Sequence, residues 1–87
     1  MSLLIVTNAE YISSYKLLLT FSNGELKEVD LSAHLIKPVF IPLKNIEVFK
    51  SFKLNPFTIE WKSGADFAPE YLYKLASKQE NQMQEVN

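Results

Sequence analysis

The chain has 87 residues, of which 47% are hydrophobic and 13% aromatic, and a formal net charge of −1 from nine basic and ten acidic side chains. This composition predicts one folded domain with a modest core and gives no electrostatic attraction to nucleic acid or anionic lipid. Because the sequence contains no cysteine, disulfides, thiolate catalysis and cysteine-ligated zinc are excluded. The apolar run at residues 3–6 is too short for a signal peptide or a membrane span, so we expect a cytoplasmic protein without membrane association.

Residues 3–12 predict a first β-strand, because β-branched and aromatic side chains dominate this stretch. Polar residues interrupt it, so we expect a bulge or bend at residues 8–10. A β-hairpin is predicted over residues 15–31, since Asn23 and Gly24 stand between two apolar-rich runs and tolerate the positive φ of a tight turn. The rest of the domain is expected to pack around this hairpin.

The sequence allows two registers for the hairpin. A two-residue loop pairs Ser22 with Glu25, whereas a three-residue loop with Gly24 in the left-handed region pairs Phe21 with Glu25. A slip of one residue moves every side chain to the other face, so apolar matching decides between them. We favour the longer loop with a glycine bulge, which sets these residues opposite each other: Tyr15 and Leu31, Leu17 and Val29, Lys16 and Asp30.

Helical signals replace the strand pattern after the hairpin. Residues 31–36 predict one helical turn, with Asp30 or Ser32 as its cap and a proline soon after its end. Residues 39–42 are expected to form an extended connector. Asn45 then predicts the cap of a short helix.

Two short strands are expected next, at residues 51–54 and 58–61, on either side of an Asn-Pro-Phe turn. Alternation along the second strand directs Ile59 and Trp61 toward the core. A Ser-Gly pair ending at Gly64 predicts the following turn, which leads to the last element of the chain.

A C-terminal helix is the best-marked element. Pro69 suits its first position, where a missing N–H costs nothing, and Phe67 lies where a hydrophobic staple would meet Leu72. The predicted buried stripe is Leu72, Leu75 and Ala76, with Tyr71 on its border. Residues 77–87 are polar and predict either a helical extension or a frayed tail.

Together these elements predict an α+β fold. We expect an antiparallel β-meander of four to five strands, short helical turns in the middle connection and one C-terminal helix packed on the sheet. Residues 1–76 are expected to form the single domain, followed by the polar segment 77–87.

Three segments resemble a known family: YKLLLTFSNGELKEVDL, FIPLKNIEVFKSFKL and IEWKSGADFAPEYLYKLA. The order and spacing of their marker residues is similar to the small bacterial family of unknown function DUF2442, over roughly residues 4–76. The markers are Phe21, Gly24, Asp30, Leu31, Pro42, Leu43, Phe49, Trp61, Gly64, Asp66, Pro69, Leu72 and Tyr73.

The resemblance implies no established activity. It implies that some members join an α+β module to a repressor-type helix-turn-helix domain. Other members are encoded beside a second small protein, which implies an antitoxin-like or accessory role in a two-gene pair. Since this sequence ends shortly after the module, we do not expect DNA binding to carry over to it.

His34 is the single histidine and the first candidate for chemistry. A catalytic histidine needs a nucleophile or an orienting acid nearby, and Asp30 could lie on the same side of a helical turn. We favour a turn histidine without a catalytic or metal role, because a metal site needs three or four ligands. Asp66 is read as a turn or helix-cap carboxylate rather than a general acid. We therefore expect no cofactor, no metal and no small-molecule substrate.

The residues expected to serve turns and caps are Asn23, Gly24, Asp30, Gly64, Asp66 and Pro69. Lysines mix with aromatic residues in one stretch, as in a single-stranded nucleic-acid platform. The members are Lys44, Phe49, Lys50, Phe52, Lys53, Phe57, Trp61 and Lys62. We expect Phe49 and Trp61 to be core residues and Glu47 and Glu60 to dilute the charge, so nucleic-acid binding is disfavoured.

Tyr71 and Tyr73 lie about 200° apart around one helix, so both cannot face the core. Together with Lys62 they form the expected interaction surface, with an uncovered strand edge as a second contact. The leading hypothesis is a non-catalytic protein-interaction module that binds a protein partner or itself. The alternatives are an antitoxin-like component of a pair and a small enzyme or ligand-binding domain. The last requires a pocket that collects His34 with Asp30 or Asp66 between aromatic walls.

Overall fold

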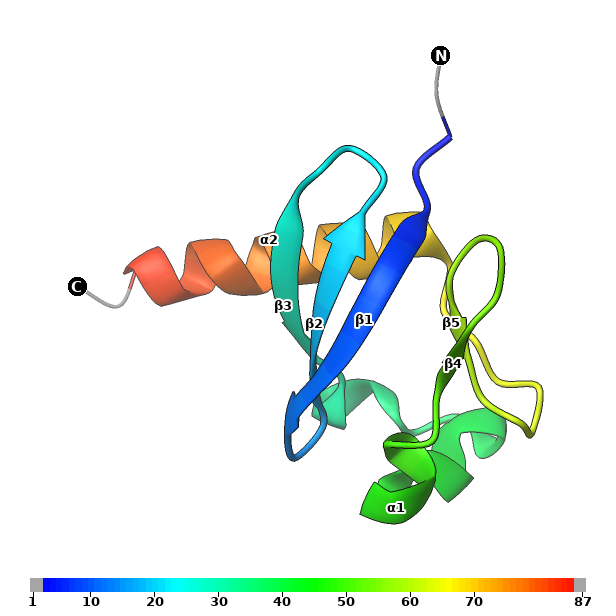
Figure 1. The fold of residues 1–87 in the computed structure, drawn as a ribbon. Coiled ribbons are helices and arrows are strands. Elements are labelled where there is room, and N and C mark those ends of the chain that lie inside the picture. Colours follow the sequence, from blue (N-terminus) through cyan, green and yellow to red (C-terminus); the bar gives the residue numbers. More distant parts are fainter. Residues whose placement is uncertain (1–2, 86–87) are drawn as a thin grey trace.

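Three antiparallel strands form the main sheet, in the spatial order β1-β2-β3 (Figure 1). They are β1 (Val6–Ser13), β2 (Lys16–Phe21) and β3 (Leu26–Asp30). The computed structural model describes residues 3–85, so residues 86–87 of the predicted tail lie outside the described part. The α+β architecture with an antiparallel meander and a C-terminal helix is confirmed.

The hairpin adopts the register with the longer loop. Leu17 lies opposite Val29 and Lys16 opposite Asp30, and the Phe21 N–H donates to the carbonyl of Glu25 (2.9 Å). Gly24 has a φ of 88°, which a residue with a Cβ adopts only at a cost. The predicted glycine-bulge register is therefore confirmed, and it places Leu17, Leu19 and Phe21 together on the buried face.

The irregularities of β1 lie elsewhere than predicted. Residues 8–10 pair regularly with β2, and the register shifts occur between Val6 and Asn8 and between Tyr11 and Ser13. The two extra residues, Thr7 and Ile12, are exposed. The two bulges therefore let β1 keep Val6 in the core while both extra side chains turn outward.

Two 3-10 segments form the middle connection, η1 (Ser32–His34) and η2 (Pro38–Lys44). The Ser32 N–H donates to Oδ1 of Asp30 (2.9 Å), so the strand's last carboxylate starts the turn. The prediction of an extended connector at residues 39–42 was wrong. Pro38 occupies the first position of η2, where its fixed φ suits the start of a helical segment. The other end of η2 is held in place because Leu43 is buried and the Tyr15 hydroxyl donates a hydrogen bond to the Lys44 carbonyl.

A short helix α1 (Ile46–Phe49) follows, and Oδ1 of Asn45 accepts a hydrogen bond from the Glu47 N–H (2.9 Å), as predicted for its cap. The next two strands, β4 (Lys53–Leu54) and β5 (Ile59–Glu60), are shorter than predicted and form a separate two-stranded sheet. This hairpin is tied to the main sheet, because the Val6 N–H donates to the carbonyl of Phe57 (2.9 Å).

Trp61 occupies the centre of the core, as predicted for it and Ile59. Its indole Nε1–H donates to the carbonyl of Phe49 (2.8 Å), and its ring packs against those of Phe49 and Phe67 at 5.8 Å and 6.0 Å. Gly64, with a φ of 95°, closes the turn behind it, where the Trp61 N–H donates to the Ala65 carbonyl. The side chain of Trp61 thus joins α1 to the segment that enters the last helix.

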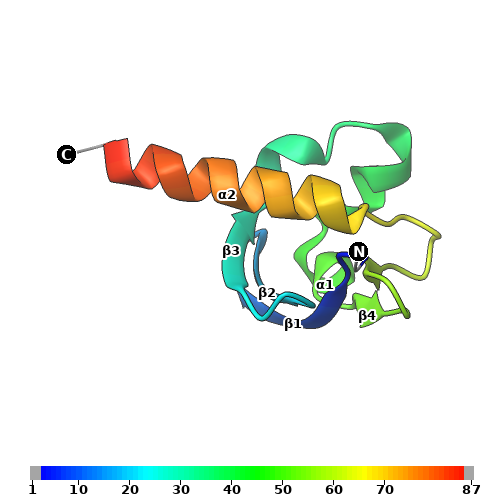
Figure 2. The same ribbon diagram turned by 90° about the horizontal axis from the view of Figure 1, so that it is seen from above.

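The helix α2 (Pro69–Glu85) crosses one face of the main sheet next to β3 (Figure 2). Leu72 and Ala76 are fully buried against the core and Leu75 is half-buried. The helix continues past residue 76, and Gln79 hydrogen-bonds to both backbone groups of Asp30 at the end of β3. Its Oε1 accepts from the Asp30 N–H (2.9 Å) and its Nε2 donates to the Asp30 carbonyl (2.9 Å).

Lys27 makes a second connection between β3 and α2. It is only 8% exposed, and its Nζ contacts carboxylate oxygens of Glu80 (3.0 Å) and Glu25 (3.3 Å) and lies 5.2 Å from the ring centroid of Tyr73. The Tyr73 hydroxyl donates to Glu25 (2.6 Å). We call these four residues the clamp.

The clamp shifts the pKa values of its members. The hydrogen bond from Tyr73, followed by Lys27, lowers the pKa of Glu25 below its ordinary 4.5. The hydrogen bond to Glu80 raises the pKa of Lys27 above 10.5, and the one to Glu25 raises the pKa of Tyr73 above 10.0. The stabilisation from Glu25 is therefore present above pH 4.5 and lost as the pH falls through its lowered pKa, whereas that from Lys27 and Tyr73 is lost at alkaline pH.

Glu25→Gln is expected to destabilise the protein at neutral pH and to lose this effect at an acidic pH below the lowered pKa of Glu25, where the wild-type carboxylate is protonated too. Urea unfolding of both proteins at the two pH values measures the difference. Glu28→Gln, at an exposed glutamate on the adjoining strand β3, serves as the matched control. A destabilisation by Glu25→Gln that is unchanged at low pH would contradict the role given to the carboxylate.

Candidate functional site

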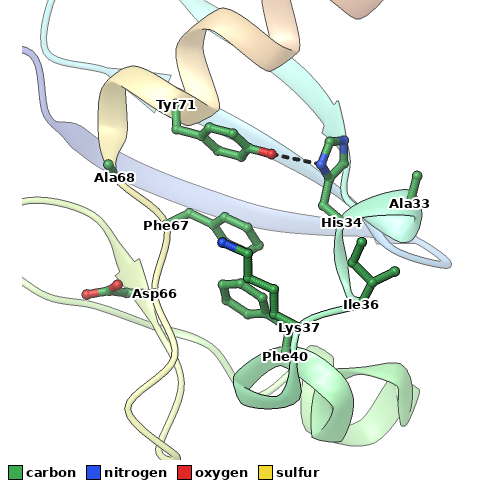
Figure 3. A pocket seen from close by; sticks show the side chains of 9 residues that line it. All are labelled: Ala33, His34, Ile36, Lys37, Phe40, Asp66, Phe67, Ala68 and Tyr71. Carbon is green, nitrogen blue, oxygen red and sulfur yellow. Dashed lines mark hydrogen bonds between the residues drawn. The ribbon is translucent and has the colours of Figure 1, made fainter.

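A pocket of about 360 Å³ lies between the η1–η2 connection and the start of α2 (Figure 3). It brings together residues about 30 positions apart in the sequence, because α2 returns across the sheet to the end of β3. The lining residues are Ala33, His34, Ile36, Lys37, Phe40, Asp66, Phe67, Ala68 and Tyr71.

Three aromatic rings form one wall of the pocket. Phe40 and Phe67 stack at a centroid distance of 4.6 Å with planes 3° apart, and Phe67 and Tyr71 follow at 5.9 Å and 9°. Phe67 is buried and also packs edge-on against Trp61, so the middle ring of the stack is held by the core. The wall is therefore preformed, which lowers the entropic cost of binding a flat or apolar group against it.

His34 and Tyr71 form a hydrogen-bonded pair at the mouth of the pocket. The Tyr71 hydroxyl and Nδ1 of His34 are 2.8 Å apart, and the rings meet edge to face (Figure 3). If the phenol donates, the neutral imidazole carries its proton on Nε2; if Nδ1–H donates, the phenol proton is free. In either arrangement the pair retains one hydrogen-bond donor for a ligand.

Lys37 and Asp66 differ in how they face the pocket. Figure 3 shows the Lys37 side chain reaching toward the aromatic wall, whereas the carboxylate of Asp66 points away from it. In the described part of the chain both salt bridges are made by Lys27, so the Lys37 ammonium has no carboxylate within salt-bridge distance. The charged group that reaches toward the pocket wall, the Lys37 ammonium, can therefore only donate hydrogen bonds.

The structure disperses the other predicted site residues. The Asp30 carboxylate accepts a hydrogen bond at the start of η1. The backbone of Asp30 is hydrogen-bonded to the Gln79 side chain, so part of the strand edge that was expected to be uncovered is occupied. Tyr73 belongs to the clamp and Lys62 is exposed in the turn after β5, so of the predicted interaction residues only Tyr71 reaches the pocket.

The residues predicted for turns and caps lie at such positions. Asn23 hydrogen-bonds to Glu25 within the hairpin loop, and Pro69 begins α2. The capping role predicted for the Asp66 carboxylate stays a prediction.

The lysine-rich and aromatic stretch does not form a stacking platform. Phe49 and Trp61 are buried, and Phe52 is half-buried, which leaves Phe57 as the exposed ring. Among the side chains that the structure describes, those of residues 3–80, no group of three or more histidine, aspartate or glutamate residues could hold a metal ion. No helix in the described part of the chain is long and apolar enough to cross a membrane.

Sequence reasoning missed Ile36 and Lys37 as site residues, and it missed Phe40 because residues 39–42 were predicted to be extended. The available signal was the pair of prolines at 38 and 42 around three large apolar residues, which is compatible with a 3-10 segment that presents one ring inward. His34 was found as a candidate, but its partner Tyr71 is 37 positions away and no local pattern connects them.

Comparisons with known proteins agree on the fold and leave the activity open. The model of the family described as "Protein of unknown function (DUF2442)" matches residues 6–78. A similar solved structure is that of "Putative DNA Binding Protein NE0471" from Nitrosomonas europaea ATCC 19718, with 28% sequence identity and a TM-score of 0.77. The match covers 91% of this chain and 52% of that one, so this chain spans about half of its length. No curated protein matches the sequence.

Proposed function

The chain belongs to the DUF2442 family of proteins of unknown function, and from this premise we propose that it acts as a non-catalytic protein-interaction module that binds through its aromatic pocket. The pocket has an imidazole, a phenol and the Lys37 ammonium, and the carboxylate of the lining residue Asp66 turns away. Because no carboxylate of the described residues is placed to orient the imidazole as a base, this arrangement supports binding rather than catalysis. Binding is the role that this set of side chains supports.

The observation that carries the proposal is a set of exposed aliphatic side chains, one of which lines the pocket while the other two flank the lining residue Phe40 in the sequence. Ile36 is 73% exposed, Val39 47% and Ile41 45%, and all three belong to the same short segment around η2. We call them the aliphatic rim. Single exposed apolar residues are ordinary, but a group of them next to a preformed apolar pocket is typical of a protein-binding surface.

The charge of this half of the molecule indicates the kind of partner. Residues 37–62 contain five lysines and two glutamates, a local charge of +3, although the whole chain has a charge of −1. A partner segment with apolar side chains and negative charge would complement both properties. The DNA-binding description of the Nitrosomonas europaea protein refers to a chain about twice as long. Phe49 and Trp61 are buried in this domain, so these two rings are not available to stack on nucleic-acid bases.

Ile36→Glu is expected to weaken partner binding at least about tenfold, because it places a charge at the apolar contact. The partner is first captured on the tagged full-length protein in its source cells and identified by mass spectrometry. The protein encoded beside it is included as a candidate. Affinity is then measured with both purified proteins.

The matched control is Leu26→Glu, since Leu26 is equally an exposed aliphatic residue but lies at the hairpin end of β3. It should bind as the wild type does. Light scattering tests whether the partner is a second copy of the chain. A monomer that binds no partner, or a partner retained equally by Ile36→Glu, would refute the proposal.

A further inference from the structure

We infer that the pocket receives the C-terminal residue of the partner polypeptide, with its apolar or aromatic side chain against the ring wall and its free carboxylate on Lys37 and the His34–Tyr71 pair. This inference rests on the proposed function and adds to it the chemistry of the group that is bound. It follows from three properties of the pocket: its size, its walls and the sign of its polar groups.

The size and walls fit one residue. A volume of about 360 Å³ is near the lower end of the range of small-ligand sites, enough for a single large side chain with its carboxyl group. The stacked rings of Phe40, Phe67 and Tyr71 offer a flat surface on which an aromatic or branched side chain can pack. Because Phe67 is fixed by the core, this surface exists before binding.

The polar groups favour an anion. Lys37 supplies an ammonium that can only donate, and the His34–Tyr71 pair retains at least one donor in either of its arrangements. A carboxylate accepts from both without leaving a donor unpaired, and charge-assisted hydrogen bonds of this kind are the stronger ones. A ligand with an ammonium group would instead be repelled by the Lys37 ammonium. The Asp66 carboxylate, which could have paired with such a ligand, points out of the pocket (Figure 3).

The aliphatic rim favours a polypeptide over a free small acid. A ligand confined to the pocket would leave Val39 and Ile41 exposed, because neither lines it. A chain that ends in the pocket can lay its preceding residues over the rim and bury these side chains. The occupant we commit to is therefore a chain terminus.

The test compares two probes that differ in one group, N-acetyl-phenylalanine with its free carboxylate and N-acetyl-phenylalaninamide without it. Each is titrated into the full-length protein while the backbone amide signals are followed by NMR. The acid should bind with a Kd on the order of 1 mM and shift the signals of His34, Lys37 and Ala68. The amide should bind at least about tenfold more weakly, because it lacks the charge.

Lys37→Met keeps the apolar stem and removes the ammonium, and it should weaken binding of the acid about tenfold while leaving the amide unaffected. Lys62→Met is the matched control, an exposed lysine outside the pocket that should change neither. Equal affinity for both probes, saturable shifts elsewhere, or no binding of the acid would overturn the inference. These outcomes would not refute the proposed interaction function if the Ile36→Glu variant still lost binding to its protein partner.

Discussion

Trp61→Ala is expected to lower the free energy of unfolding by about 3 to 5 kcal/mol, the usual cost of truncating a large buried aromatic residue. The side chain is fully buried, and its loss leaves a cavity between α1 and the segment that leads into α2. It also leaves the carbonyl of Phe49 without its indole donor. Since small domains are stable by only about 5 to 15 kcal/mol, this change should remove a large share of the stability.

Urea unfolding followed by circular dichroism measures the effect. Trp61→Phe should fall between the wild type and the alanine variant, because it keeps most of the ring packing and removes the hydrogen bond. Phe57→Ala, an exposed aromatic residue in the neighbouring turn, should change the stability by about 0.5 kcal/mol or less. A Trp61→Ala variant as stable as Phe57→Ala would contradict the central position assigned to the indole.

Ending the chain after Ala76 is expected to cost about 2 to 3 kcal/mol, although the removed segment is polar. The truncation deletes both Gln79 hydrogen bonds to Asp30 and the Glu80 partner of the Lys27 ammonium. A hydrogen bond contributes about 0.5 to 1.5 kcal/mol, and loss of a charged partner adds to the sum. The same unfolding measurement applies.

Two single variants separate the causes of this loss. Gln79→Ala should account for about half of it, whereas Lys78→Ala, on the exposed side of the same turn, should have little effect. If the truncated chain were as stable as the full one, residues 77–87 would be a tail without a part in the fold.

The fold could be predicted from the sequence where local chemistry and burial agree. Gly24 supplies the positive φ of the hairpin loop, and matching Leu17 with Val29 selects one register. Asn45 and Pro69 mark helix starts because each satisfies or removes an orphan backbone group. In these places the decisive interaction lies within a few residues or between adjacent strands.

The prediction failed where distant packing decides the conformation. Residues 39–42 have no local helical signal beyond the prolines at 38 and 42, and the 3-10 segment η2 forms because Leu43 reaches the core and Phe40 reaches the ring of Phe67. Asn8-Ala9-Glu10 looks like an interruption of β1 but pairs regularly, since the bulges fall at the flanking residues. Propensity is a weak prior that tertiary contacts override.

The candidate site depends even more on contacts between residues that are far apart in the sequence. Its defining pair joins η1 to α2, and its ring wall joins η2 to the loop before α2. The sequence supplied His34, Asp66 and Tyr71 as separate candidates, and their distances became known only when α2 was placed across the sheet. Which of them faces a ligand is a matter of side-chain direction, which no spacing rule determines.

The hydrogen bonds of the Gln79 amide affect the tendency of this protein to aggregate at high concentration. A three-stranded sheet offers two open sides on which a neighbouring molecule can add a strand and begin aggregation. On the β3 side the terminal peptide group already has both of its hydrogen bonds, and on the β1 side the Val6 N–H is taken by Phe57. Each open side is thus shortened at one end by the protein's own chain, which reduces the length of edge available for intermolecular β-pairing.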